Sequence, residues 1–178
     1  MKIIGHRGAK GLAPENTLKS IRRAIACKVD VIEVDARMQD DEIVLSHDPI
    51  KPGGNYDTLE DALTLISGKV PLNIEIKERA VVPELKKLLQ HYRGKIIISS
   101  FEYKTLHDAH TQLPKIELAV LEKWSGVRAI AEATLLGTKR VHISQQWLWS
   151  GFVRSMKHRG FELYAYTVNS SDRAEELE

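Results

Sequence analysis

Acidic side chains lie two residues apart in a segment that is otherwise largely apolar. Glu33 and Asp35 occur in VIEVDAR, residues 31–37, and alternate residues of a strand point to the same face. Glu75, in NIEIK, lies on the next predicted strand of this kind. Carboxylates about 4 Å apart repel by roughly 4 kcal/mol per pair at an effective dielectric constant of about 20, so a cation must relieve the repulsion. Oxygen ligands without cysteine suit a hard ion, so we predict one Mg²⁺ or Ca²⁺ at these three residues.

Two simpler interpretations of these charges remain open. Glu33 and Asp35 could pair with basic side chains on an exposed edge strand. Glu75 and Lys77 share the same spacing and could form an ion pair with each other. The intervening positions are apolar, however, which is typical of a parallel strand that is buried on both faces. Burial of the acidic residues is therefore the favoured interpretation.

Histidines accompany the acidic residues at two places. His6-Arg7-Gly8 ends the first apolar segment, and His47 follows a hairpin-like stretch, DDEIVLSHDP. The Arg7 guanidinium is suited to bind a phosphate, and Gly8 permits a tight turn beside it. Because imidazole titrates near neutral pH, His6 and His47 could act as general acid and base on a phosphodiester.

Strand-like and helix-like segments alternate along the whole chain, which predicts parallel strands joined by helical crossovers. Polar residues interrupt the apolar runs at the ends of three successive strands, which favours a closed (β/α) barrel over an open doubly wound sheet. The helices are expected to begin near Pro14, Thr58, Pro83 and residues 102, 126 and 149. The seven predicted strands are residues 2–6, 31–37, 71–77, 95–101, 116–121, 140–145 and 161–168.

Length and composition indicate a single domain, residues 1–178, with a short hairpin or insertion around 38–58. The net charge of +2 contains no basic block, so we expect no nucleic-acid partner. Cys27 is the only cysteine, and no stretch is typical of a signal peptide or a membrane span. We therefore expect a cytoplasmic protein without stable membrane association.

The chain resembles the glycerophosphodiester phosphodiesterases in four ordered segments: HRGAKGLAPENTL, VIEVDARMQDDEIVLSHD, LNIEIKE and YTVN. The resemblance implies a phosphodiesterase-type TIM barrel that hydrolyses glycerophosphodiesters to glycerol phosphate and an alcohol. It implies Glu33, Asp35 and Glu75 as metal ligands and His6 and His47 as the acid-base pair. Arg7 and Lys77 would bind the phosphate. Glu15 would help to organise the substrate site, and Asn16 would cap the first helix.

The sequence also departs from this family. Glu42 stands where the family usually has glycine, and Tyr166 replaces a tryptophan. The segment between His47 and Glu75 is shorter than usual, although this segment commonly covers the substrate. A non-catalytic barrel that binds a metal or a phosphodiester is therefore an alternative function. A phospholipase acting on intact lipid is another, for which Trp124, Trp147 and Trp149 could form an apolar rim, but buried packing or a small-alcohol pocket is favoured for them.

A barrel of this family has eight strands, and seven are predicted here. We expect the eighth strand to be missing, so that the first and seventh strands have unpaired edges. Unpaired edges promote association, and a homo-oligomer formed through the open edge is possible.

Overall fold

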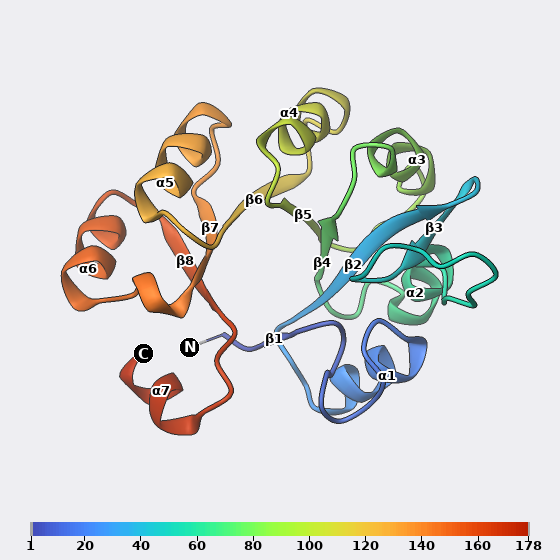
Figure 1. The fold of residues 1–178 in the computed structure, drawn as a ribbon, viewed down its shortest axis with the longest axis horizontal. Helices are drawn as coiled ribbons and strands as arrows, with labels where there is room; N and C mark the ends of the chain where they lie inside the picture. Colours follow the sequence, from blue (N-terminus) through green and yellow to red (C-terminus); the bar gives the residue numbers. More distant parts are fainter. Residues whose placement is uncertain (1, 178) are drawn as a thin grey trace.

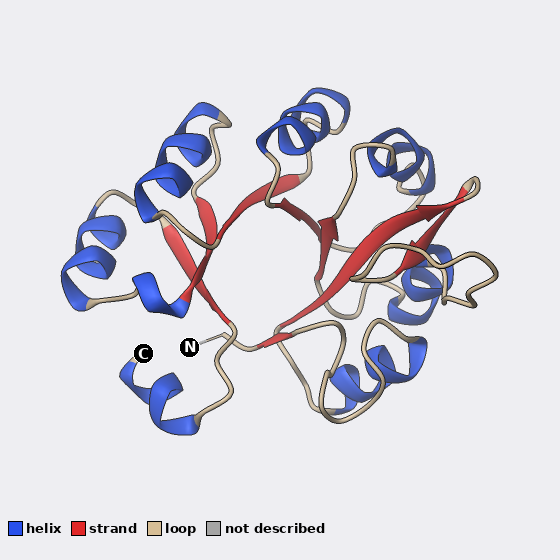
Figure 2. Cartoon of the chain, in the orientation of Figure 1, coloured by secondary structure: helices blue, strands red, loops and turns tan. Residues whose placement is uncertain are grey.

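The computed structural model describes residues 2–177. Seven parallel strands curve into an open barrel, and the helices surround it on the outside (Figure 1). Figure 2 shows the strands as the central layer of this arrangement. In sheet order the seven strands are β1 (Ile4–Gly5), β2 (Val31–Gln39), β4 (Leu72–Ile76), β5 (Ile96–Ser100), β6 (Glu117–Glu122), β7 (Arg140–Ser144) and β8 (Glu162–Tyr166).

The two ends of this order, β1 and β8, are the edges of the sheet. Within residues 2–177, no ladder of hydrogen bonds joins them. The predicted seven-stranded, open form of the barrel is therefore confirmed. Association through these edges stays a prediction.

A hairpin extends the second strand beyond the barrel. Asp40, with a φ of 52°, turns the chain back, and β3 (Glu42–Leu45) pairs antiparallel with the end of β2, from Ala36↔Leu45 to Gln39↔Glu42. After β3, the Ser46 N–H donates to the Asp35 carbonyl at 3.1 Å, which brings the chain back to the barrel. The hairpin thus places His47 next to the end of β2.

The crossover helices lie close to their predicted positions. They are α1 (Leu18–Ala26), α2 (Leu59–Ile66), α3 (Val81–Leu88), α4 (Tyr103–Gln112), α5 (Gly126–Leu135) and α6 (Ser150–His158). A further helix, α7 (Ser171–Glu176), follows β8. Thr58 caps α2 as expected, since its side chain accepts the Asp61 N–H. The start of α1 differs from the prediction: Thr17 is its N-cap and forms a capping box with Ser20, whereas Asn16 has a φ of 53° and lies before the cap. The prediction that Asn16 caps this helix is wrong.

Both faces of the parallel strands are covered, as the apolar alternation predicts. Ile32, Val34 and Ile74 face the helices and are fully buried in the main core. The other face lines the barrel interior, where a smaller apolar cluster contains Val31, Ile97 and Ala119. On β2, Glu33 and Asp35 follow Val31 on the same face. The acidic residues therefore lie inside the barrel, towards the carboxyl ends of the strands.

Candidate active site

Three carboxylates from neighbouring strands meet inside the barrel. Asp35 on β2 is the register partner of Glu75 on β4, and Glu33 precedes Asp35 on the same face. One oxygen from each of the three groups lies within 4.8 Å of the others, and all three residues are buried. The structure therefore brings together the three residues that the sequence predicts as metal ligands.

Glu33 is the least neutralised of the three carboxylates. Its Oε2 accepts the backbone N–H of Arg7 at 2.7 Å, but its buried Oε1 has no hydrogen-bond partner. Burial, together with the neighbouring charges of Asp35 and Glu75, raises the pKa of Glu33 well above its usual value. The site is thus short of positive charge at this oxygen.

Asp35 is held by groups on three sides. The Asn16 amide donates to its Oδ2 at 2.7 Å, and its own backbone N–H donates to Asn16 Oδ1 at 3.0 Å. Arg7 Nε lies 3.3 Å from Oδ2 without the alignment of a hydrogen bond, and Lys77 Nζ lies 3.3 Å from Oδ1. These contacts fix the position of the carboxylate.

Lys77 connects two of the carboxylates. Its Nζ donates to Glu75 Oε1 at 2.5 Å and also approaches Asp35. The ion pair proposed as a simple interpretation of Glu75 and Lys77 therefore exists, but within the cluster and not on an exposed edge. Burial, followed by the charge of Asp35, raises the pKa of Glu75, and Lys77 opposes that effect.

The turn after β1 carries the second cation into the site. Arg7 has a φ of 50°, and its Nη1 donates to Glu15 at 2.6 Å. Gly8, with a φ of 82°, is packed so closely that an added Cβ would lie 2.1 Å from Ser20 Oγ. A side chain at residue 8 would displace α1, so this tight turn requires glycine.

Glu15 lies at the outer side of this cluster. Its carboxylate binds both Arg7 and Lys10, the latter at 2.7 Å. These cations hold the pKa of the Glu15 carboxyl below its usual value, with Lys10 making the largest contribution. Glu15 thus orients Arg7 beside the carboxylates.

Both predicted catalytic histidines lie near the carboxylates. His6, at the end of β1, is partly buried, and burial followed by the charge of Arg7 lowers its pKa. His47 is more open, with 39% of its side chain exposed, and its Nδ1 lies 2.8 Å from Asp48 Oδ1. The backbone carbonyl of His47 accepts two hydrogen bonds from Arg37. Asp48 and Arg37 therefore orient the ring and the backbone of His47.

The carboxylates are suited to a divalent cation. Three closely spaced oxygen ligands, one with an unpartnered buried oxygen, match the donors that Mg²⁺ and Ca²⁺ prefer. Cysteine is not among them, and the charge deficit at Glu33 is the kind that a cation removes.

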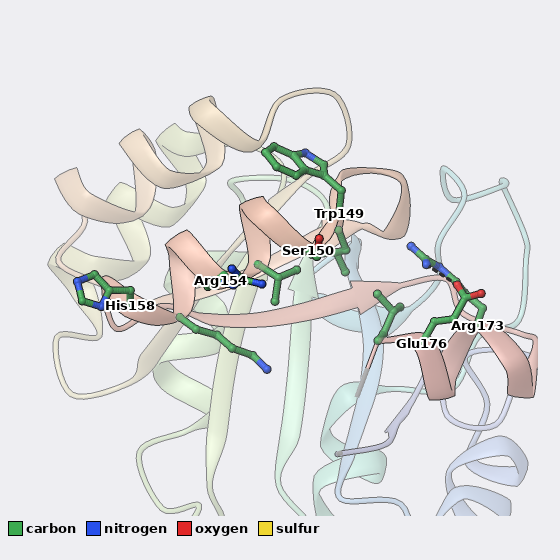
Figure 3. A pocket seen from close by; sticks show the side chains of 10 residues that line it. Trp149, Ser150, Arg154, His158, Arg173 and Glu176 are labelled. Carbon is green, nitrogen blue, oxygen red and sulfur yellow. Dashed lines mark hydrogen bonds and ion pairs between the residues drawn. The ribbon is translucent and has the colours of Figure 1, made fainter.

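A groove in the described residues lies away from these carboxylates. It has a volume of about 720 Å³ and runs between α6 and α7 on the outside of the barrel (Figure 3). Arg173 spans it, donating to Glu176 and to the Gln145 carbonyl. None of the predicted site residues lines this groove.

Comparison with known proteins agrees with this geometry. The model of the glycerophosphoryl diester phosphodiesterase family matches residues 6–61 and 52–178. The chain belongs to this family. The two matched pieces overlap at residues 52–61, after His47, where the sequence predicts a shortened segment.

Individual members of the family are similar over nearly the whole chain. A glycerophosphodiester phosphodiesterase of Caldanaerobacter subterraneus subsp. tengcongensis is 27% identical over 216 residues, which cover 99% of this chain and 88% of that protein. A phosphodiesterase of Oleispira antarctica, solved in complex with the product sn-glycerol-3-phosphate, has a TM-score of 0.92 at 23% identity. The match covers 99% of this chain and 88% of that chain. A glycerophosphodiester phosphodiesterase of Thermotoga maritima has a TM-score of 0.85 at 22% identity, with coverage of 99% and 90%. These likenesses confirm the barrel fold.

Sequence reasoning missed the role of Asn16 within the family's PENT turn. Its side chain contacts Asp35, which is 19 residues away. The available signal was its residue type, because asparagine tolerates the left-handed backbone conformation and offers both a donor and an acceptor. An asparagine in a tight loop beside an acidic strand is therefore also a candidate to hold a carboxylate.

Proposed function

We propose that this protein hydrolyses glycerophosphodiesters to glycerol phosphate and an alcohol, with one divalent cation held by Glu33, Asp35 and Glu75. The observation that carries the proposal is the buried carboxylate cluster with Arg7 and Lys77 beside it. Membership of the glycerophosphoryl diester phosphodiesterase family supports the substrate class. A divalent cation, when bound, supplies Lewis-acid stabilisation of charge on a phosphoryl oxygen.

The roles of the cationic side chains follow from their positions. Arg7 and Lys77 would bind the non-bridging oxygens of the phosphodiester, replacing part of their contact with Asp35. Charge that develops on those oxygens is then met by positive groups already in place. Glu15 would keep Arg7 oriented during this exchange.

His6 and His47 would move the protons. The glycerol hydroxyl next to the phosphate attacks phosphorus, the bond to the alcohol breaks, and water then opens the resulting cyclic phosphate. One histidine accepts the proton of the attacking hydroxyl, and the other gives a proton to the leaving alcohol. Asp48 would orient the His47 ring through the contact at Nδ1.

The first experiment measures glycerol phosphate released from glycerophosphocholine or glycerophosphoethanolamine. We expect release with Mg²⁺ or Ca²⁺ and its loss with a chelator. His6→Ala and His47→Ala should each lower turnover by roughly 10²–10⁴-fold. His91→Ala is the control, because His91 is exposed and follows α3.

The contrary results are equally clear. Full activity in either histidine variant would exclude the acid-base pair. Metal binding with no hydrolysis of either substrate would favour the non-catalytic barrel. In a metal-loaded crystal, ligand distances of about 2.0–2.1 Å would identify Mg²⁺, and distances of about 2.3–2.6 Å would identify Ca²⁺.

A further inference from the structure

Exposed apolar side chains are concentrated at one end of the barrel. The described residues include seven large hydrophobic residues that are exposed. Ile3 and Leu135 lie before β1 and at the end of α5, away from the site. The other five lie in or directly beside the loops that follow the carboxyl ends of strands: Leu12, Phe101, Trp124, Val127 and Trp149. These loops surround the mouth of the candidate active site.

Four of these residues, Phe101, Trp124, Val127 and Trp149, follow the adjacent strands β5, β6 and β7, and we call them the apolar rim. Its inner end lies at the site, because Lys77 Nζ is 6.0 Å from the centre of the Phe101 ring. Its outer end is Trp149, whose ring lies 6.4 Å from that of Phe152. The rim therefore extends from the phosphate-binding lysine to the outer helices.

Packed residues join the members of the rim. Phe101 contacts Tyr166 edge to face, with 6.0 Å between ring centres. The Tyr166 hydroxyl donates to the Glu122 carbonyl at 2.8 Å, and Trp147 Nε1 donates to the next carbonyl, that of Lys123, at 3.2 Å. Phe152 lies against Gly126, where an added Cβ would be 2.8 Å from its ring. The rim thus rests on a fixed base.

The degree of exposure separates the three tryptophans that the sequence singled out. Trp147 is partly buried against the core, whereas Trp124 and Trp149 are 72% and 62% exposed. Figure 3 shows Trp149 extending away from Arg173 and Glu176 of α7. The expectation of buried packing is therefore wrong for Trp124 and Trp149. Trp149 also forms part of the lining of the groove between α6 and α7.

Cationic side chains lie among these apolar residues. Lys123 Nζ is 4.7 Å from the centre of the Trp124 ring, and no carboxylate in residues 2–177 forms an ion pair with it. Lys104, in the first turn of α4, is also exposed. Indole rings beside lysines are the combination that suits the boundary between lipid headgroups and acyl chains.

We propose that the apolar rim docks reversibly on the surface of a phospholipid bilayer that contains anionic lipids. Trp124 and Trp149 would enter the headgroup region, and Lys123 would bind lipid phosphates. A few strongly protruding side chains on separate loops suit this partner better than a protein, whose interface requires about 800 Å² of matching surface. A bilayer would also present phosphodiesters to the mouth of the site, an advantage that rests on the proposed function.

The experiment is co-sedimentation with vesicles of phosphatidylcholine and phosphatidylglycerol in equal parts. We expect the protein to sediment with the vesicles, and the variant Trp124→Ser/Trp149→Ser to lose roughly a hundredfold in partition coefficient. Leu135→Ser is the matched control, because Leu135 is 74% exposed but lies away from the mouth; its partition should not change. Vesicles of phosphatidylcholine alone should bind the protein more weakly than the mixed vesicles. The expected difference is about fivefold for each lysine that contacts an anionic headgroup.

Three results would overturn the inference. They are no sedimentation of the unaltered protein, equal sedimentation of the double variant, and self-association that the double variant abolishes, which would assign the rim to a second copy of the chain. Hydrolysis of soluble glycerophosphocholine is measured in parallel and should be the same in the double variant. If hydrolysis is absent but the vesicle results hold, the proposed function fails and the docking surface stands.

Discussion

Asn16 and Asp35 hold each other through two reciprocal hydrogen bonds. The Asn16 amide group donates to the Asp35 carboxylate at 2.7 Å, and its carbonyl oxygen accepts the Asp35 backbone N–H at 3.0 Å. Asn16 is 5% exposed and has a left-handed φ of 53°. The turn after β1 thus determines where one carboxylate of the candidate metal site points.

Replacing Asn16 with glycine tests this relationship, because glycine keeps the left-handed backbone and removes only the side chain. We expect Asn16→Gly to weaken Mg²⁺ or Ca²⁺ binding by about 10–100-fold, since residues that orient metal ligands typically contribute this much. Titration calorimetry measures the affinity directly.

Asn73→Ala is the control for this prediction. Asn73 is also buried, but its amide donates to Ser99 Oγ at 3.0 Å and not to a carboxylate. An unchanged metal affinity in Asn16→Gly would show that Asp35 is positioned without it.

Replacing Glu33 with glutamine tests the charge deficit of the site. Glutamine keeps the shape and still accepts the Arg7 N–H, but it removes the repulsion with Asp35 and Glu75. In chelator we expect Glu33→Gln to melt higher than the unaltered protein, by about 2–4 °C for each kcal/mol of relieved repulsion. Added Mg²⁺ should raise the Tm of the unaltered protein and have little effect on the variant.

Glu42→Gln is the matched control, because Glu42 is exposed at the tip of the hairpin. Its Tm should respond to Mg²⁺ as the unaltered protein does. The same response in Glu33→Gln would argue against Glu33 as a ligand.

His142 should make the stability of the protein depend on pH. It is buried in β7, its ring lies 5.1 Å from that of Tyr164, and its Nε2 has no hydrogen-bond partner. Burial, with a smaller effect of the Arg140 charge, lowers its pKa from 6.5 to about 3. The folded state therefore resists a proton that the unfolded chain accepts, and the free energy of unfolding falls as the pH drops below 6.5.

The glutamine in His142→Gln does not titrate. Subtracting the pH profile of the variant from that of the unaltered protein therefore removes the contributions of the carboxylates that both proteins share. Between pH 6.5 and about 5, the unaltered protein should lose about 2 kcal/mol relative to the variant. Urea unfolding at several pH values measures this difference. Parallel profiles would mean that His142 accepts a proton in the folded state.

Much of the site follows from spacing along single strands. Glu33 and Asp35 share a face because strand side chains alternate, and apolar neighbours on both faces predict their burial. Crossover helices between the strands predict that Glu75 lies on a neighbouring strand, at the same end of the barrel. These inferences need only local geometry and the direction of each strand.

Contacts between distant segments could be decided only by the tertiary structure. The spacing of Glu75 and Lys77 is compatible with an ion pair between these two residues alone. Only the register of β2 with β4 shows that Lys77 also reaches Asp35. Asparagine is also a common helix N-cap, so the residue type of Asn16 fits either role. The fold places its side chain against Asp35. The exposure of Trp124 and Trp149 likewise depends on which elements cover them. Side-chain alternation is a property of one strand, whereas these contacts depend on how separate segments pack, and composition and periodicity do not encode that packing.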